Sequence, residues 1–387
     1  MTIAATATME APAKVEIETF CWTPAHVAAI GDAANARAPI ITRSDRVLPR
    51  TDIWDHWPVI DREGRTVQFD DGPLVIALSA PVLPDPEARH AIARMRLMQK
   101  GKYGWRDFGY LFRDGFDPGS REWAGTAVLE PDGSTLSLYY TSAGVRGEAE
   151  PSFLQRLLLT KGRLTVDDDG ARVMGWTTPV DLVVPDDHFY QADMAGGGAV
   201  GTIKAFRDPF PIIDPATGTE YLLFTASKPG LSSSPWNGLI GVARREGGVC
   251  TPLPPLVDAE GVNNELERPH IVRHEGRFYL FWSTQAKVFA EGGPHGPNGL
   301  YGLVSDNVLG PWRPLNGTGL VLANPVEAPF QAYSWLVLDD LTVWSFADLV
   351  GLAQPPRDIA EARHAFAGTP APVVQLAIED DISRIVA

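Results

Sequence analysis

The sequence contains little cysteine, no long apolar run and no excess of positive charge, and each shortage excludes a class of protein. Cys21 and Cys250 are the two cysteines in 387 residues, too few for a disulfide framework or a cysteine metal cluster. No apolar stretch approaches the length that spans a bilayer. The net charge of −15 argues against phosphate-bearing partners such as nucleic acids and anionic membrane surfaces. We therefore expect a globular protein that binds neither nucleic acid nor membrane.

Signals for export, metal binding and helices are also scarce. Residues 1–18 have no basic region followed by an apolar core, so no classical signal peptide is visible and a disordered lead is predicted. The eight histidines show no metal-ligand spacing, and no cofactor is expected. Helical patterns are confined to residues 24–36 and 86–98, so strands and helices do not alternate and a doubly wound sheet is disfavoured.

Strand patterns fill most of the remaining chain. The 37 Gly and 33 Pro suit many short strands joined by turns. The apolar run at 74–80 has the length of a strand and is typical of one buried on both faces. Turn-forming residues at 130–134, 214–218 and 274–276 each separate two apolar runs, which predicts hairpins.

A segment rich in Trp, Arg and acidic residues occurs five times, at intervals of roughly 60 to 85 residues. The copies lie at 53–58, 122–125, 206–209, 265–269 and 332–335. Repeats of this length usually mean one structural unit repeated around an axis. We predict an all-β fold, a five-bladed β-propeller with a central-channel active site in a single domain over 19–387, with a short N-terminal helical segment packed outside. A two-sheet sandwich is the alternative.

Three copies of the repeat carry a carboxylate at an equivalent position, namely Asp55, Asp208 and Glu267. The first strand of each propeller blade lines the central channel, so these three side chains should converge. Carboxylates that share a pocket repel, which raises the pKa of at least one and separates a protonated acid from an ionised nucleophile. Retaining glycoside hydrolysis needs this pair of groups. A single Asp before a turn is more often a turn or cap residue, but three in register with a repeat favour a site.

Aromatic and basic neighbours of the carboxylates point to a sugar. Trp54, Trp57 and Trp123 offer flat apolar faces for sugar rings. Arg207 and Arg268 offer forked donors to hydroxyl groups. Any one of these residues is more often a core Trp or a structural salt bridge, so the hypothesis depends on their combination.

Several blocks resemble the signature motifs of glycoside hydrolase family 68, which contains levansucrases, inulosucrases and related bacterial β-fructofuranosidases. The blocks lie at 53–58, 122–126, 206–209, 267–270, 296–306, 309–312 and 319–325. The resemblance extends from about residue 21 to the C-terminus and implies a five-bladed propeller. It also implies a retaining enzyme that cleaves sucrose through a covalent fructosyl intermediate and passes fructose to a sugar acceptor or water. An extracellular or periplasmic location is implied as well.

The resemblance also implies roles for individual residues. Asp55 would be the nucleophile, Asp208 would stabilise the oxocarbenium-like transition state, and Glu267 would be the general acid/base. Contacts to sucrose or support of the acid/base are implied for Trp54, Trp123, Arg207, Glu265, Arg268, Gln285 and Tyr333. The partners would be sucrose and fructan or oligosaccharide acceptors.

This sequence departs from the family pattern near these motifs. Thr225 stands where members usually carry an acidic residue, the basic residue usual near Gln285 is missing, and Trp335 stands where His is common. We expect these changes on the acceptor side, where they would affect transfer more than sucrose cleavage. Some members use a structural calcium, but the acidic ligand expected just before Glu265 is Asn264 here, so no metal is predicted.

Three alternative functions stay open. One is a β-fructofuranosidase that hydrolyses sucrose with little transfer. Another is a carbohydrate-binding propeller with impaired catalysis, and a third is an enzyme of the same propeller class that acts on arabinosyl or other furanosides.

Overall fold

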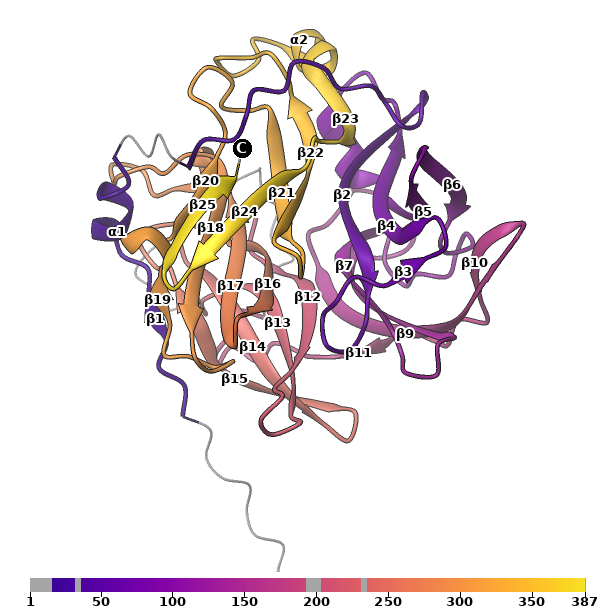
Figure 1. The fold of residues 1–387 in the computed structure, drawn as a ribbon, viewed down its shortest axis with the longest axis horizontal. Helices are drawn as coiled ribbons and strands as arrows, with labels where there is room; N and C mark the ends of the chain where they lie inside the picture. The colour runs from indigo at the N-terminus through magenta and orange to yellow at the C-terminus, as the bar shows by residue number, and fades with distance from the viewer. Residues whose placement is uncertain (1–15, 32–35, 193–202, 231–234, 387) are drawn as a thin grey trace, which may run out of the picture.

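A computed structural model describes residues 16–31, 36–192, 203–230 and 235–386, and strands dominate these ranges. Residues 1–15 of the predicted disordered lead lie outside them. The strands form four hydrogen-bonded sheets, one of ten strands and three of five. In Figure 1 they follow one another around a centre, from purple through pink to orange and yellow. The prediction of an all-β fold is confirmed, and the four sheets contradict the alternative of a two-sheet sandwich.

The ten-stranded sheet consists of two antiparallel groups. A short parallel pairing of β2 with β7, at Val59–Ala127 and Ile60–Val128, joins them. The first group contains β2 (Thr51–Ile60), β3 (Gln68–Phe69), β4 (Gly72–Pro81), β5 (Arg94–Gly101) and β6 (Gly104–Tyr110). The second contains β7 (Arg121–Leu129), β8 (Thr135–Ala143), β9 (Gln155–Asp167), β10 (Gly170–Met174) and β11 (Val180–Asp181).

Each of the other three sheets is formed by strands that are consecutive in the chain. The N-terminal strand β1 joins the first of these sheets. That sheet contains β1 (Phe20–Cys21), β12 (Phe206–Ile213), β13 (Glu220–Ser227), β14 (Gly238–Glu246) and β15 (Val249–Asp258). The next contains β16 (Glu267–His274), β17 (Arg277–Thr284), β18 (Gly299–Ser305), β19 (Arg313–Pro314) and β20 (Leu320–Ala323). The last contains β21 (Ala332–Val337), β22 (Thr342–Leu349), β23 (Phe366–Pro370), β24 (Val374–Glu379) and β25 (Ile382–Val386).

The first strands of these groups touch in a closed ring. β2 contacts β7, β7 contacts β12, β12 contacts β16, β16 contacts β21, and β21 contacts β2. Each carries one copy of the repeat identified in the sequence. The repeats therefore face one centre although they lie far apart along the chain.

Strand and turn predictions agree with the structure. The apolar run at 74–80 forms the buried part of β4, which pairs with β2 on one side and β5 on the other. The predicted turns at 130–134, 214–218 and 274–276 connect β7 to β8, β12 to β13 and β16 to β17. Because these turns are local, their sequence signals were sufficient to place them.

Helix predictions were less accurate. Of the helix expected at 24–36, α1 covers Pro24–Ala28, and the chain reaches a positive φ of 52° at Gly31. Residues 32–35 of that prediction lie outside the described part of the chain. The second predicted helix, 86–98, is a 3₁₀ helix, η2 (Pro86–Ala91), followed by β5. Pairing with β4 takes residues from Arg94 onward into the sheet, so tertiary contacts override the helical pattern. The other helices within the described ranges are α2 (Ile359–Ala365), which was not predicted, and the 3₁₀ turns η3 (Ala286–Val288) and η4 (Leu315–Gly317).

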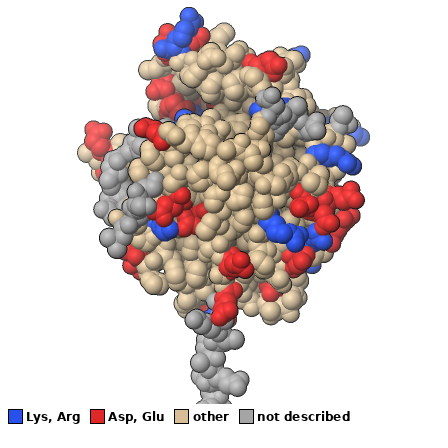
Figure 2. Space-filling view, turned by 90° about the vertical axis from the view of Figure 1, so that its left-hand side faces the viewer, with Lys and Arg blue, Asp and Glu red and all other residues tan. Residues whose placement is uncertain are grey.

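The N-terminal segment lies on the outside of the sheets, as predicted (Figure 1). Its strand β1 pairs in parallel with β15, and the buried Trp22 packs edge-on against Trp282 and Tyr301. On the face shown in Figure 2, acidic side chains lie around a broad area without charged groups, in keeping with the net charge of −15. None of the helices in the described part of the chain combines the length and apolar character that a membrane crossing needs.

Candidate active site

Each strand of the inner ring is interrupted by a β-bulge at the repeat motif. Register shifts fall at Ile53/His56, Trp123/Gly125, Arg207/Phe210, Glu267/His270 and Tyr333/Leu336. A bulge bends a strand and re-aims the side chains beside it. Three of the bulges hold a non-glycine residue at positive φ, namely Asp208 (60°), Arg268 (52°) and Ser334 (60°). Such backbone costs energy and persists where the surroundings determine it, which is common at functional sites.

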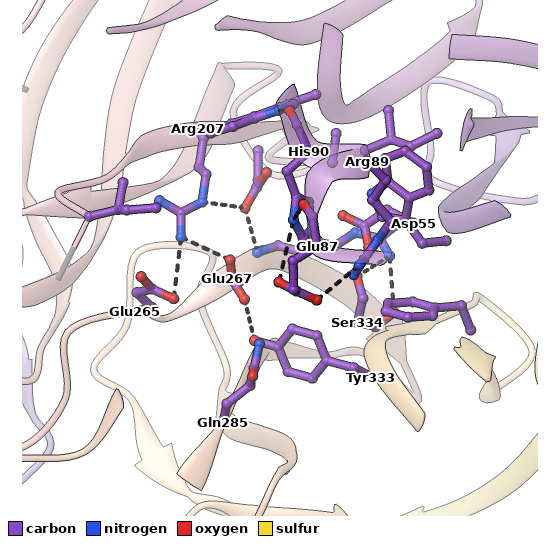
Figure 3. A pocket seen from close by; sticks show the side chains of 18 of the residues that line it. Asp55, Glu87, Arg89, His90, Arg207, Glu265, Glu267, Gln285, Tyr333 and Ser334 are labelled. Carbon is purple, nitrogen blue, oxygen red and sulfur yellow. Dashed lines mark hydrogen bonds and ion pairs between the residues drawn. The ribbon is translucent and has the colours of Figure 1, made fainter. Parts of the chain in front are cut away.

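The bulges surround a cavity of about 520 Å³. Its lining includes all ten residues predicted for the site: Trp54, Asp55, Trp123, Arg207, Asp208, Glu265, Glu267, Arg268, Gln285 and Tyr333. Figure 3 shows the labelled members pointing toward one another from several strands and the segments next to them. The predicted convergence of the three carboxylates is therefore found in the structure, while the role of each residue stays a prediction.

Arg207 connects the acidic groups of the cavity. Its Nη2 donates to Glu267 Oε1 at 2.8 Å and lies 3.7 Å from Glu265 Oε2 (Figure 3). Its Nε lies 3.8 Å from Asp208 Oδ2. One guanidinium thus holds three carboxyl groups that would otherwise repel one another. Glu267 also accepts a hydrogen bond from the hydroxyl of Tyr333 through Oε2.

Arg268 ties the strands β2, β16 and β21 together. Its Nη1 donates to the carbonyl and the hydroxyl oxygen of Ser334, at 3.0 and 2.9 Å, and its Nη2 donates to the carbonyl of His56 at 3.1 Å. Its backbone N–H donates to Asp208 Oδ2 at 3.0 Å. The Ser334 hydroxyl in turn hydrogen-bonds to Asp55, so Arg268 supports two of the three carboxylates.

The carboxyl groups have different proton affinities. Burial raises the pKa of Asp208 to about 6, and burial together with the charge of Glu267 raises the pKa of Glu265 to about 7. Burial also raises the pKa of Asp55, against the opposing charge of Arg268. Burial alone would raise the pKa of Glu267, but Arg207 and the Tyr333 hydroxyl outweigh it and lower that pKa. These opposite directions favour Glu265 over Glu267 as the protonated member of the pair.

The predicted aromatic faces divide into two kinds. Trp54 and Trp123 line the cavity, and Trp123 Nε1 donates to the carbonyl of His90 at 3.2 Å. Trp57 was also expected to present a face to sugar, and this was wrong. Its ring lies in the core and is absent from the cavity lining. Because the bulge in β2 ends before Trp57, the strand alternation beyond it turns this ring toward the core.

The cavity is also lined by ionisable residues that sequence reasoning missed. Glu87, Arg89 and His90 come from η2, Lys287 from η3, and Asp348 from the end of β22. We call Glu87, Gln285, Lys287 and Asp348 the rim. Four ionisable residues crowded into the connection 85–90 were the one signal in the sequence that pointed there. Burial raises the pKa of Asp348 to about 7.

The departures from the family pattern do not all lie on the acceptor side, as had been expected. Gln285 lines the cavity and hydrogen-bonds to Tyr333. Thr225 and Trp335 are buried beneath it and do not line it. The Thr225 hydroxyl lies 3.1 Å from Asp208 Oδ2, and the backbone N–H of Trp335 donates to Ser283 Oγ at 2.9 Å. The expectation was therefore wrong for both, because their side chains point under the site.

Asn264, on which the expectation of no metal was based, contacts a cation of the chain itself. Lys204 Nζ donates to Asn264 Oδ1 at 2.7 Å and to Asn237 Oδ1 at 2.6 Å. Among the described residues no group of three His, Cys, Asp or Glu side chains is arranged to hold a metal ion.

Comparison with known proteins identifies the family. The family model described as Levansucrase/Invertase matches residues 15–234 and 233–387. The levansucrase Lscbeta of Pseudomonas syringae pv. actinidiae is 33% identical over an alignment that covers 86% of this chain and 82% of the relative. A levansucrase of Zymomonas mobilis subsp. mobilis is 32% identical, with 84% and 79% covered.

Solved structures agree with these matches. An inulosucrase from Halalkalicoccus jeotgali, bound to kestose, superposes with a TM-score of 0.86 at 37% identity and 95% coverage of both chains. The levansucrase of Gluconacetobacter diazotrophicus has a TM-score of 0.82 at 24% identity, covering 96% of this chain and 90% of its own, and this supports the fold alone. Since the family model matches both halves of the sequence, the chain belongs to the levansucrase/invertase family, glycoside hydrolase family 68, and is an enzyme of the fructosyltransferase/β-fructofuranosidase type.

Proposed function

We propose that this enzyme cleaves sucrose with retention of configuration and passes the fructosyl group to a sugar acceptor or to water. The observation that carries the proposal is the convergence of Asp55, Asp208 and Glu267 from three separate strands on one cavity. Levansucrase and inulosucrase relatives support sucrose as the substrate and fructan as the product.

In the first half of the reaction, a carboxylate oxygen of Asp55 attacks the anomeric carbon of the fructosyl unit. The bond from that carbon to the glycosidic oxygen breaks, and Glu267 gives its proton to the departing oxygen of glucose. Asp208, held ionised, accepts hydrogen bonds from sugar hydroxyls and stabilises the positive charge that develops on the ring. In the second half, the acceptor hydroxyl or water attacks the same carbon, gives its proton to Glu267 and releases Asp55.

Glu267 needs a proton before it can act as the acid. In the free site Arg207 and Tyr333 favour its ionised form, whereas Glu265, beside the same guanidinium, holds a proton to about pH 7. We assign Glu265 a supporting role, in which it acts on the acid/base Glu267 through the Arg207 guanidinium that both contact. Trp54 and Trp123 supply apolar faces to the sugar rings, and Arg268, Gln285 and Tyr333 supply polar groups around them.

The propeller is assigned five blades, formed by β2–β6, β7–β11, β12–β15, β16–β20 and β21–β25. The closed ring of five first strands supports this division, and so does the five-fold repeat. The parallel pairing of β2 with β7 is too short to merge the first two groups into a single blade. Residues 19–387 would then form a single catalytic domain, because the ring closes only when the last group meets the first.

A single assay tests the proposal. The protein is incubated with sucrose, and glucose and free fructose are measured over time. We expect glucose release, with equal fructose for hydrolysis or less fructose for transfer. A folded protein that releases no glucose would contradict the proposal and favour the alternative of a carbohydrate-binding propeller.

A further inference from the structure

Three buried hydroxyl groups link neighbouring strand groups just beneath the cavity. Thr141 on β8, Thr225 on β13 and Ser283 on β17 are fully buried, and each pairs with the residue at which a first-strand bulge begins. These partners are Trp123, Arg207 and Glu267. The three hydroxyls therefore hold the same position in three successive groups.

Each hydroxyl also reaches the backbone at or just before the bulge of the first strand in the next group. Thr141 Oγ1 accepts from the backbone N–H of Asp208 at 2.9 Å, and Ser283 Oγ accepts from that of Trp335 at 2.9 Å. Thr225 Oγ1 lies 2.9 Å from the carbonyl oxygen of Leu266, the residue before Glu267. Buried polar groups of this kind fix the position of one strand relative to the next.

Thr225 differs from the other two because it also contacts a carboxylate of the site. Its Oγ1 lies 3.1 Å from Asp208 Oδ2, the oxygen that already accepts from the Arg268 N–H. A hydroxyl has one proton and donates it to one acceptor at a time. Between a neutral carbonyl and an ionised carboxylate, the carboxylate is the stronger acceptor. The proton of Thr225 is thus directed to Asp208 whenever Asp208 is charged.

We propose that Thr225 is a positioning residue that holds the Asp208 carboxylate ionised and oriented toward the cavity. The inference rests on the proposed function, in which Asp208 works as an anion. The charged groups that face Asp208 are Arg207 on its own strand, Glu267 and Arg268 on β16, and Asp55 on β2. Two of them are anions that oppose the ionisation of Asp208. The hydroxyl of Thr225 offers a donor from beneath that favours the ionised form.

The test compares Thr225→Val, which keeps the volume and removes the hydroxyl, with Thr225→Ser, which keeps the hydroxyl. We expect Thr225→Val to lower kcat for glucose release by about ten- to a hundredfold, the usual cost of a hydrogen bond to a charged group. The acid limb of the pH profile of kcat/KM should move up by about one unit, because Asp208 loses a donor to its ionised form. Thr225→Ser should restore both quantities to within a few-fold of the parent enzyme.

Thr160→Val is the matched control. Thr160 on β9 is equally buried, donates to the carbonyl of Thr177 at 2.6 Å and lies outside the cavity lining. It should lower the melting temperature as Thr225→Val does, with kcat and the pH profile unchanged. A folded Thr225→Val protein with the parent kcat and acid limb would overturn the inference, as would a Thr225→Ser protein as impaired as Thr225→Val. If the parent protein itself releases no glucose, the proposed function is wrong. If the parent is active and only the Thr225 variants deviate from expectation, the role of Thr225 alone is wrong.

Discussion

The floor of the cavity, which we define as Asp55, Arg207, Asp208, Glu267 and Arg268, differs from its rim in how the charges are held. Floor residues lie at bulges of the inner strands. Arg207 bonds to Glu267 and Arg268 to Asp208, and the Ser334 hydroxyl connects Arg268 with Asp55. Rim residues come from two 3₁₀ turns, from the residue that precedes one of them and from the end of one strand, and Glu87 and Lys287 are exposed. The floor is thus preorganised for one reaction, whereas exposed rim residues such as Lys287 can vary with little effect on it.

The largest expected effect separates the nucleophile from a rim carboxylate. Asp55→Asn should lower glucose release from sucrose by about 10⁴-fold or more, because an amide cannot form the covalent intermediate. Asp348→Asn, the matched change on the rim, should lower it by less than about tenfold. Initial rates of glucose release under saturating sucrose measure both. Equal losses in the two variants would contradict the division into floor and rim.

The second effect concerns stability. Arg207→Lys replaces a planar guanidinium that serves three carboxyl groups by a single ammonium, leaving buried anions without a partner. We expect the free energy of unfolding to fall by about 3 kcal/mol or more. Arg156→Lys, in an exposed pair with Asp181, should change it by less than about 1 kcal/mol. Urea unfolding followed by circular dichroism checks this, and similar shifts in both variants would show that the floor is not the better-paired region.

The third effect is a pH profile set by the floor carboxyl groups Asp208 and Glu267 together with Glu265 beside them. Asp208 must be ionised and has a pKa raised to about 6, while the Glu265/Glu267 pair must retain a proton and Glu265 has a pKa of about 7. A bell-shaped dependence of kcat/KM with limbs near these values is therefore expected.

Two variants assign the basic limb of that profile. Glu265→Gln should move it to lower pH, because Glu267 then loses the anion that opposes its own ionisation. Asp348→Asn should leave it in place, although the pKa of Asp348 is also about 7. A basic limb that moves with Asp348 and not with Glu265 would place the titrating group on the rim.

The sequence predicted the carboxylates that belong to the repeat, and it was less accurate for side-chain direction and for the connections between strands. Asp55, Asp208 and Glu267 were predicted together because each copy of the repeat occupies one inner strand. Side-chain direction next to a bulge could not be read in the same way, so Trp57, Thr225 and Trp335 were placed in or around the cavity although they lie beneath it. The rim was missed because η2 is a connection, and its sequence runs into β5 with a helical pattern that sheet pairing overrides.

The smallest expected effect lies on the rim and concerns the fate of the fructosyl group. Lys287 is an exposed donor at the edge of the cavity, and its charge acts on Glu265 beside the floor. Lys287→Met keeps the length of the side chain and removes the ammonium, so a sugar acceptor would lose a hydrogen bond that water does not need. We expect the transferred share of fructose, measured as glucose minus free fructose, to fall by about two- to fivefold while glucose release changes less than about twofold.

Gln285→Ala is the companion variant, because Gln285 is a rim residue that also touches the floor through Tyr333. The Gln285→Ala change should lower glucose release as well as transfer, because Gln285 orients Tyr333 and Tyr333 donates to Glu267. A Lys287→Met enzyme in which glucose release and transfer fall in parallel would show that the exposed rim serves cleavage. In that case the distinction between a fixed floor and a variable rim would apply to structure but not to the two halves of the reaction.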